Sequence, residues 1–258
     1  MIRNLFAAAL VAALCAGLAT AAIQHFRVTP LILHAETFEG EGGHSHGEAA
    51  VAVTTEHDHA EGTAAHSHDD AAATTSAAPE EWAPQDGFER TAYTTLASVL
   101  AAAGFALLIG AISMFAGIPI TFANGFLWGI AGFITFSLAP AFGLAPELPG
   151  MPAGDLMARQ VWWAGTALAT GAACLLLAKT QASWAFAVAI ALVVIPHIIG
   201  APLAPDEPSA VPAHLATEFA ATTLGTALVF WLVLGTVFGK LNDVFAVRHA
   251  AIPAGATL

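Results

Sequence analysis

Charged residues are scarce in this chain of 258 residues. Only 10% are Asp, Glu, Lys or Arg, whereas a soluble domain carries about 25%. Seven bases stand against nineteen acids, which leaves no basic face suited to nucleic acid. Hydrophobic residues reach 57%, and the mean hydropathy is +0.71. The composition is therefore that of a membrane protein, with the lipid bilayer as its first partner and nucleic acid excluded as another.

Cysteines and catalytic motifs are also few. Cys15 and Cys174 both lie in apolar stretches, so we expect no structural disulfide. The chain contains no GxxxxGK[ST] phosphate loop, no HExxH zinc motif, no nucleophile elbow and no Cys-X-X-Cys pair. We therefore expect a protein that is not an enzyme, does not hydrolyse ATP and has no permanently bound cofactor.

Long apolar runs recur along the chain, each near the roughly 20 residues that cross a bilayer as a helix. Backbone groups in lipid must be hydrogen-bonded internally, and no alternating barrel pattern is present. The predicted fold is an all-α membrane protein with about six transmembrane helices and a disordered His-rich extracytoplasmic loop. The predicted spans are Leu5–Ile23, Thr94–Phe115, Phe122–Phe142, Val161–Ala178, Ser183–Ala201 and Leu215–Phe238.

The first run permits two interpretations. Arg3, the apolar run and Ala19-Thr20-Ala21 resemble a secretory signal with its cleavage site. The run is long enough to span a bilayer, so we expect an uncleaved helix. If the N-terminus lies in the cytoplasm, four of the seven Lys and Arg residues lie on the cytoplasmic side. The predicted regions are a first transmembrane helix (1–29), an acidic His-rich extracytoplasmic loop (30–92), a five-helix bundle (93–239) and a cytoplasmic tail (240–258).

The predicted loop contains the pattern that most narrows the function. Thirteen of the nineteen acids lie between Pro30 and Tyr93. Imidazole binds Zn, Cu, Ni and Co, and the carboxylates attract cations. Below about pH 6, metal capture should weaken because imidazole becomes protonated. The sequence therefore predicts a metal-capturing loop, with the His-X-His pairs His44/His46, His57/His59 and His66/His68 as ligands.

Polar residues at or near the spans are candidates for an ion path, because they are costly in lipid. Gln24, His25 and Glu36 flank the outer end of the first helix. They could receive an ion from the loop, or lie among lipid headgroups. His197 follows Pro196, which frees a helix carbonyl. Broken helices of this kind often form transport sites, but His197 could instead cap the helix end.

The last span has a similar polar stripe. His214, Glu218 and Thr222 are spaced by four, so they share one helix face. His214 and Glu218 could bind a cation or relay protons, or Glu218 could stabilise the positive end of the helix. Two glycine pairs, Gly125/Gly129 and Gly235/Gly239, fit the small-xxx-small pattern and are expected to serve helix packing.

Several of these segments together resemble the CbtA family of predicted cobalt transporter subunits. The most specific part is Pro-His-x-x-Gly-Ala-Pro at Pro196–Pro202. The looser parts are Gly17-Leu18, Gln24, Pro30-Leu31-Ile32, Ala35-Glu36, Val211-Pro212, Leu215, Phe219 and Trp231…Gly235. The resemblance implies a multi-pass protein of the bacterial inner membrane that takes up cobalt for corrinoid (cobalamin) synthesis. It also implies a small single-helix partner, CbtB, with its own His-rich segment.

Two functions follow. In the first, the chain is a cobalt uptake transporter subunit, with Co2+ or Ni2+ as cargo, whose loop delivers the ion to Gln24, His25, Glu36, His197, His214 and Glu218. In the second, the chain is a membrane-anchored metal-binding, buffering or sensing protein that moves nothing. The His pairs cannot select cobalt, because imidazole sites generally bind Cu, Ni and Zn more tightly.

Overall fold

The computed structural model describes residues 2–42, 84–85 and 87–250, and every regular element in them is helical. Five helical segments are long and apolar enough to cross a membrane, and the 17-residue α7 is a shorter apolar helix. The predicted fold class, an all-α membrane protein with about six such helices, is confirmed. The elements are α1 (Ile2–Ile23), η1 (Gln24–Val28), α2 (Thr29–Gly42), α3 (Phe88–Ala116), α4 (Phe122–Phe133), η2 (Ile134–Leu138), α5 (Ala139–Ala141), α6 (Leu156–Lys179), α7 (Ser183–Ile199) and α8 (Ala213–Ala250).

The first helix is longer than the sequence suggested. We placed its end at residue 29, but α1, η1 and α2 follow one another without a break as far as Gly42. Pro30 does not stop it, because the preceding turn widens into a π-helix and so adjusts to the missing hydrogen bond. Helix α3 likewise starts at Phe88, inside the predicted loop. The three His-X-His pairs and the predicted disorder around them fall outside the described residues.

Both π-helical segments precede a proline at the same distance. Segment η1 ends two residues before Pro30, and η2 ends two residues before Pro140. Proline has no N–H to donate, and its ring crowds the carbonyl four residues earlier. A π turn relieves that crowding, because its carbonyls bond to the N–H five residues later, as Gln24 and Ile134 do. Helix α4 is therefore broken inside the apolar part of the chain, a feature the sequence analysis missed.

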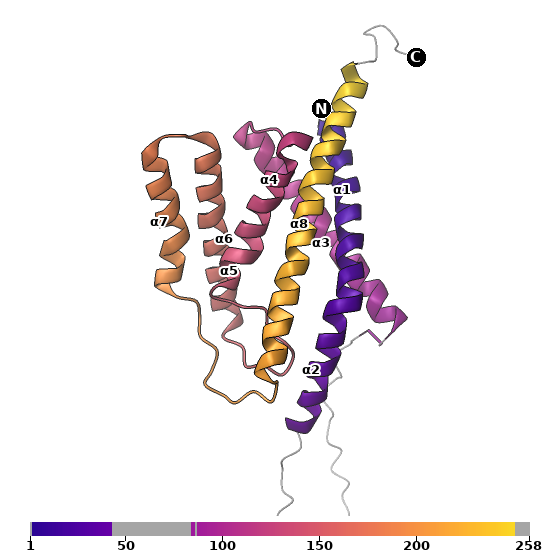
Figure 1. The fold of residues 1–258 in the computed structure, drawn as a ribbon, viewed down its shortest axis with the longest axis vertical. Coiled ribbons are helices and arrows are strands. Elements are labelled where there is room, and N and C mark those ends of the chain that lie inside the picture. Colours follow the sequence, from indigo (N-terminus) through magenta and orange to yellow (C-terminus); the bar gives the residue numbers. More distant parts are fainter. Residues whose placement is uncertain (1, 43–83, 86, 251–258) are drawn as a thin grey trace, which may run out of the picture.

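The helices pack in the order α3, α1, α8, α4, α6, α7, with α6 also touching η2 and α5 (Figure 1). The main core joins an alanine face of α1 to large side chains of α8, including Trp231 and Phe238. Trp231 is 1% exposed and stacks on Phe136 of η2 with ring centres 5.5 Å apart. The core therefore holds α8 between the two helices that contain π turns.

The two predicted glycine pairs meet each other, as expected for a packing role. A Cβ placed on Gly235 would collide with the backbone of Gly125 and Gly129, and one on Gly239 would collide with Thr121. A Cβ on Gly129 would lie 2.5 Å from the Trp231 carbonyl oxygen. The α4 and α8 backbones are thus in direct contact, which only glycine permits at this crossing.

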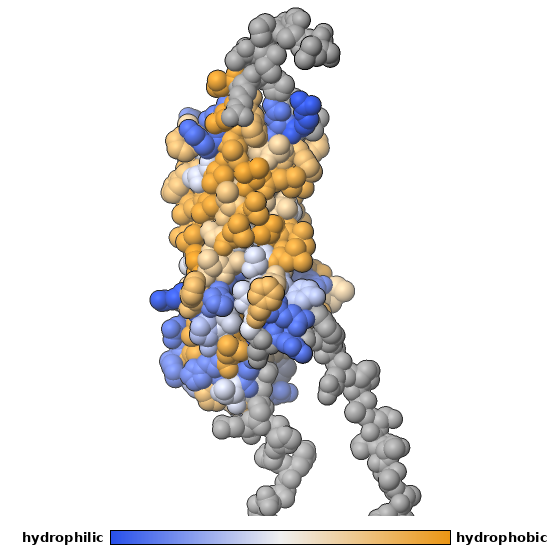
Figure 2. All heavy atoms as spheres, turned by 90° about the vertical axis from the view of Figure 1, so that its right-hand side faces the viewer, coloured by the Kyte–Doolittle hydropathy of each residue, from blue (hydrophilic) through white to orange (hydrophobic). Residues whose placement is uncertain are grey.

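A second, smaller core forms where α2, the α5–α6 connection and the start of α8 meet. It contains Val28, Ala35, Leu148, Val211, Leu215 and Phe219. On the face seen in Figure 2, an apolar belt crosses the middle of the molecule, with hydrophilic residues above and below it. The second core fixes the elements below this belt, which are the elements that contain most of the candidate path residues.

Candidate ion path

The candidate path residues of the described chain lie at one end of the bundle. Gln24, His25 and Glu36 belong to η1 and α2, His197 to the last turn of α7, and His214 and Glu218 to the start of α8. All these segments lie at the lower end in Figure 1, where α2 ends and α3 begins. The sequence therefore identified residues that share one end, although it could not show that they do.

Three of these residues contact α3. Gln24 Oε1 accepts a hydrogen bond of 2.9 Å from Ser98 Oγ, and His25 Nδ1 lies 3.4 Å from Thr91 Oγ1. Glu36 pairs with Arg90, with Oε1 2.5 Å from Nη2 and a longer contact of 3.4 Å between Oε2 and Nη1. This ion pair joins the end of the first helix to the start of α3. The three side chains are spread along α3 and do not converge on one point.

The ion pair should contribute little to stability. Both side chains are about a third exposed, at 34% for Glu36 and 28% for Arg90, so water screens their attraction. We expect Glu36→Gln to lower the free energy of unfolding by less than about 1 kcal/mol. Thermal unfolding of the purified protein in detergent measures this. If the free energy of unfolding fell by several kcal/mol, the ion pair would instead be a main contributor to the packing of the helix ends.

His197 is the best-connected candidate. Its Nδ1 lies 2.8 Å from the Val193 carbonyl oxygen, and its Nε2 lies 3.0 Å from the Ala139 carbonyl oxygen just after η2. A neutral imidazole has one N–H and donates to only one of them. The Val193 contact stays within α7, one turn before His197, and the Ala139 contact joins α7 to the broken α4 helix. To bind a metal, the ring would have to leave one carbonyl, so its role in a path stays a prediction.

The aromatic surroundings hold His197 in place. Trp162 of α6 lies edge-on to the imidazole, with ring centres 5.7 Å apart. Its Nε1 donates a 3.1 Å hydrogen bond to the Pro196 carbonyl oxygen. Phe142 lies edge-on at 6.3 Å. The Pro196–His197 turn therefore ties α6, α7 and α5 together.

His214 and Glu218 are exposed, one turn apart on the same face of α8. The buried side chains Leu215 and Phe219 follow each of them and point into the second core. The helix is therefore held from its apolar side, and the imidazole and carboxylate stay accessible. This geometry suits a cation-receiving face. Glu218 is the sixth residue of α8 and lies beyond its first turn, where the positive end of the helix dipole acts.

In the part of the chain that the structure describes, no three His, Cys, Asp or Glu side chains converge in a way that could hold a metal ion. Gln24, His25, Glu36, His197, His214 and Glu218 therefore do not form one preformed centre there. The predicted capture ligands His44, His46, His57, His59, His66 and His68 lie outside the described residues.

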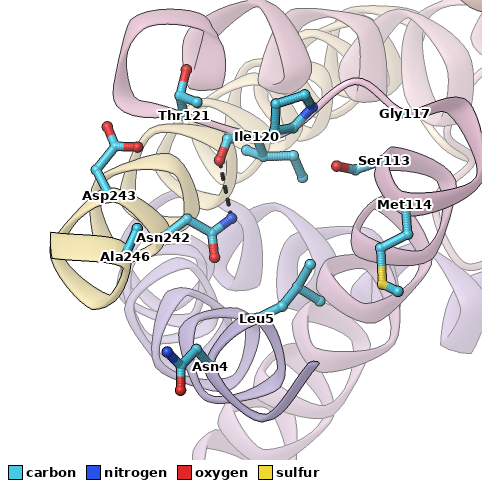
Figure 3. Close-up of a pocket in the computed structure, with 11 residues that line it drawn as sticks. Asn4, Leu5, Ser113, Met114, Gly117, Ile120, Thr121, Asn242, Asp243 and Ala246 are labelled. Atoms are coloured by element: carbon cyan, nitrogen blue, oxygen red, sulfur yellow. Dashed lines mark hydrogen bonds between the residues drawn. The ribbon is translucent and has the colours of Figure 1, made fainter. Parts of the chain in front are cut away.

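A cavity of about 750 Å³ opens at the other end of the bundle (Figure 3). It is lined by the start of α1, the end of α3, the α3–α4 connection and the end of α8. Asn242 donates a 3.0 Å hydrogen bond to the Ile120 carbonyl oxygen, and Asp243 Oδ2 accepts one of 2.9 Å from Phe122 N. Asn4 and Thr121 add polar groups to walls that include Leu5. No local signal marks this cavity, because its residues come from three distant parts of the sequence.

Apolar helices around an alanine and glycine core, polar ends and an interrupted helix define a multi-pass membrane protein. The chain belongs to the CbtA family, described as a probable cobalt transporter subunit, whose model matches residues 2–243. This match confirms the resemblance seen at Pro196–Pro202. The word subunit implies a partner chain. No match was found among curated proteins or among solved structures.

Proposed function

We propose that the chain imports cobalt across the bacterial inner membrane, with the His-X-His pairs capturing the ion outside. The observation that carries this proposal is the arrangement of the bundle. All the path candidates lie at the end where the His-rich segment leaves α2 and enters α3, and a cavity opens at the other end. Cobalt is proposed as the transported metal because the family is described as a probable cobalt transporter subunit.

The two central helices support a route from the first helix to the last. Leu5 of α1 and Phe238 of α8 both lie against Gly110, so they are at one level of an antiparallel pair. Twenty residues further toward the other end, from 5 to 25 and from 238 to 218, His25 comes level with Glu218. An ion passed from Glu36 to His25 would therefore have Glu218 and His214 on the adjacent helix as its next ligands.

The partner and the energy source complete the proposal. The family name implies a second subunit, and we propose a small single-helix chain of the CbtB kind with its own histidines. Because the sequence has no phosphate-binding loop, the energy would come from that partner, the membrane potential or a proton gradient. Nickel is a second cargo, because the same imidazole ligands accept it.

The competing function is metal binding, buffering or sensing without transport. Its support is that the described residues hold no preformed metal centre, and that both His197 nitrogens face carbonyl oxygens. The deciding experiment expresses the chain, alone and with a candidate partner, in cells that lack their own cobalt and nickel uptake. Selective accumulation of cobalt among Co, Ni, Zn and Cu, counted by mass spectrometry, would establish transport. Metal binding without accumulation in either case would establish the competing function.

Removal of the capture ligands tests the His-rich segment itself. We expect replacement of all six histidines of the His-X-His pairs by Ala to raise the cobalt concentration for half-maximal uptake at least about tenfold, which is about 1.4 kcal/mol of lost capture. The maximal rate should change little, because the intramembrane residues are untouched. Radioactive cobalt uptake across a concentration series measures both. An unchanged half-maximal concentration would show that the His pairs do not capture the transported ion.

A further inference from the structure

A line of small polar side chains runs through the apolar part of α6. Thr166, Thr170 and Cys174 are spaced by four residues, which places them on one face of the helix. They continue the stripe begun by Trp162, the residue that holds the Pro196–His197 turn. We call this line, together with Thr135 of η2, the α6–η2 seam.

The seam faces the broken part of α4. Thr135 Oγ1 donates to Cys174 Sγ at 4.0 Å, which fixes the thiol against η2. Gly171 lets this contact form, since a Cβ there would lie 3.3 Å from the Thr135 methyl group. Thr135 belongs to η2, the π segment that ends two residues before Pro140, so this hydroxyl–thiol contact lies at the helix break.

Two hydroxyls of the seam have no partner. Thr166 and Thr170 are each 0% exposed, and neither Oγ1 makes a hydrogen bond within the described structure. Thr20 and Thr223 are also buried without a partner, whereas Thr226 Oγ1 donates to the carbonyl of Thr222, one turn earlier. Only Thr166 and Thr170 lie on the same helix face as a thiol. A buried hydroxyl without a hydrogen-bond partner has lost its bonds to water and gained none in return. The geometry therefore calls for a further polar species beside these hydroxyls.

We propose that the α6–η2 seam is an intramembrane binding site for a partly hydrated divalent cation. Cys174 Sγ supplies the soft ligand, and the hydroxyls of Thr135 and Thr170 supply oxygens directly or through water. Thr166, about 12 Å from Cys174 along the helix, lies on the approach to this site. A metal binds the thiolate, so the thiol proton leaves as the sulfur–metal bond forms. This inference rests on the proposed cobalt transport and adds a site inside the membrane.

The position of the seam suits this role. Its Trp162 end adjoins His197, which is among the residues at the His-rich end of the bundle. Its other end, Cys174, lies five residues before Lys179 at the opposite end of α6. A cation leaving the His197 turn would therefore meet hydroxyls at successive turns of α6 before it reached the sulfur.

The two native cysteines provide a matched test in the full-length protein in membrane vesicles. Cys15→Ala leaves Cys174 as the target of a water-soluble methanethiosulfonate reagent. Cys174→Ala leaves Cys15, which is exposed on the outer surface of α1 within its apolar span. We expect Cys174 to be labelled at least about tenfold faster than Cys15. We also expect Co2+ to slow the labelling of Cys174 and an equal concentration of Mg2+ to slow it less, because Mg2+ prefers oxygen ligands.

Each outcome decides the proposal. Cys174 as unreactive as Cys15 would overturn it, and so would labelling that Co2+ does not slow or that Mg2+ slows equally. In the Cys15→Ala background, Thr166→Val and Thr170→Val keep the side-chain shape but remove the hydroxyls, and they should reduce the Co2+ protection. Labelling requires no net uptake. If Co2+ does not slow the labelling of Cys174 but cells accumulate cobalt normally, the seam proposal fails and the transport proposal stands. If Co2+ slows the labelling but cells accumulate no cobalt, only the seam proposal is supported.

Discussion

Gly235→Ala should prevent stable assembly of the bundle. The new Cβ would lie inside the backbone of Gly125 and Gly129 on α4, where no flexible side chain can move aside. Overpacking of a well-packed core costs about 1–3 kcal/mol, and more when backbone must shift. We expect a loss at or above about 3 kcal/mol, seen as a large drop in Tm in detergent and in the amount of protein in the membrane.

Gly225→Ala is the matched control on the same helix. Gly225 is exposed, and a Cβ there would have no heavy atom within 4 Å. Alanine in a helix interior is favoured over glycine by up to about 1 kcal/mol, so Tm should stay the same or rise. Equal Tm values for the two variants would contradict the direct backbone contact between α4 and α8.

The second large effect is expected at His197. Its ring joins α7 to the carbonyl after η2 and lies against Trp162 at the end of the seam. We expect His197→Ala to lower cobalt uptake by at least about tenfold, a loss of about 1.4 kcal/mol or more. Cobalt binding by the purified protein should remain, because the His-X-His pairs are intact. Uptake assays and equilibrium binding on the same variant measure the two effects.

A conservative variant separates an ion-path role from a packing role. The side-chain amide of His197→Gln can still donate to the Ala139 carbonyl, but it is a poor ligand for cobalt. If His197 handles the ion, the Gln variant should be as inactive as the Ala variant at an unchanged Tm. Recovery of uptake in His197→Gln would show that the imidazole serves only to link α7 to the broken helix.

Much of the fold could be predicted from hydrophobic length alone. The predicted start of α4 at Phe122 and of α7 at Ser183 agree with the structure. The glycine pairs of α4 and α8 were also predicted, because contact between helices in lipid depends on small residues at a spacing of four. These features come from local patterns, and a single sequence contains those patterns in full.

The parts that could not be predicted depend on contacts between distant segments. The sequence predicts a first transmembrane helix over residues 1–29, but the helix continues to Gly42, with Val28 of η1 and Ala35 of α2 buried in the second core. The seam was missed because Thr166 and Thr170 are ordinary in a sequence, and only their burial without a partner makes them notable. The shared end of His25 and Glu218 likewise depends on the antiparallel packing of α1 and α8.

The unbroken first helix carries Glu36 far beyond the polar residues of η1. Glu36 lies twelve residues beyond Gln24, and at about 1.5 Å per residue it stands about 18 Å further along the helix. Interactions between solvent-exposed charges decay within a Debye length, about 8 Å in physiological salt. Charges at the level of Gln24 therefore act only weakly on Glu36, and the strength of its ion pair with Arg90 should fall as the ionic strength of the bulk solution rises.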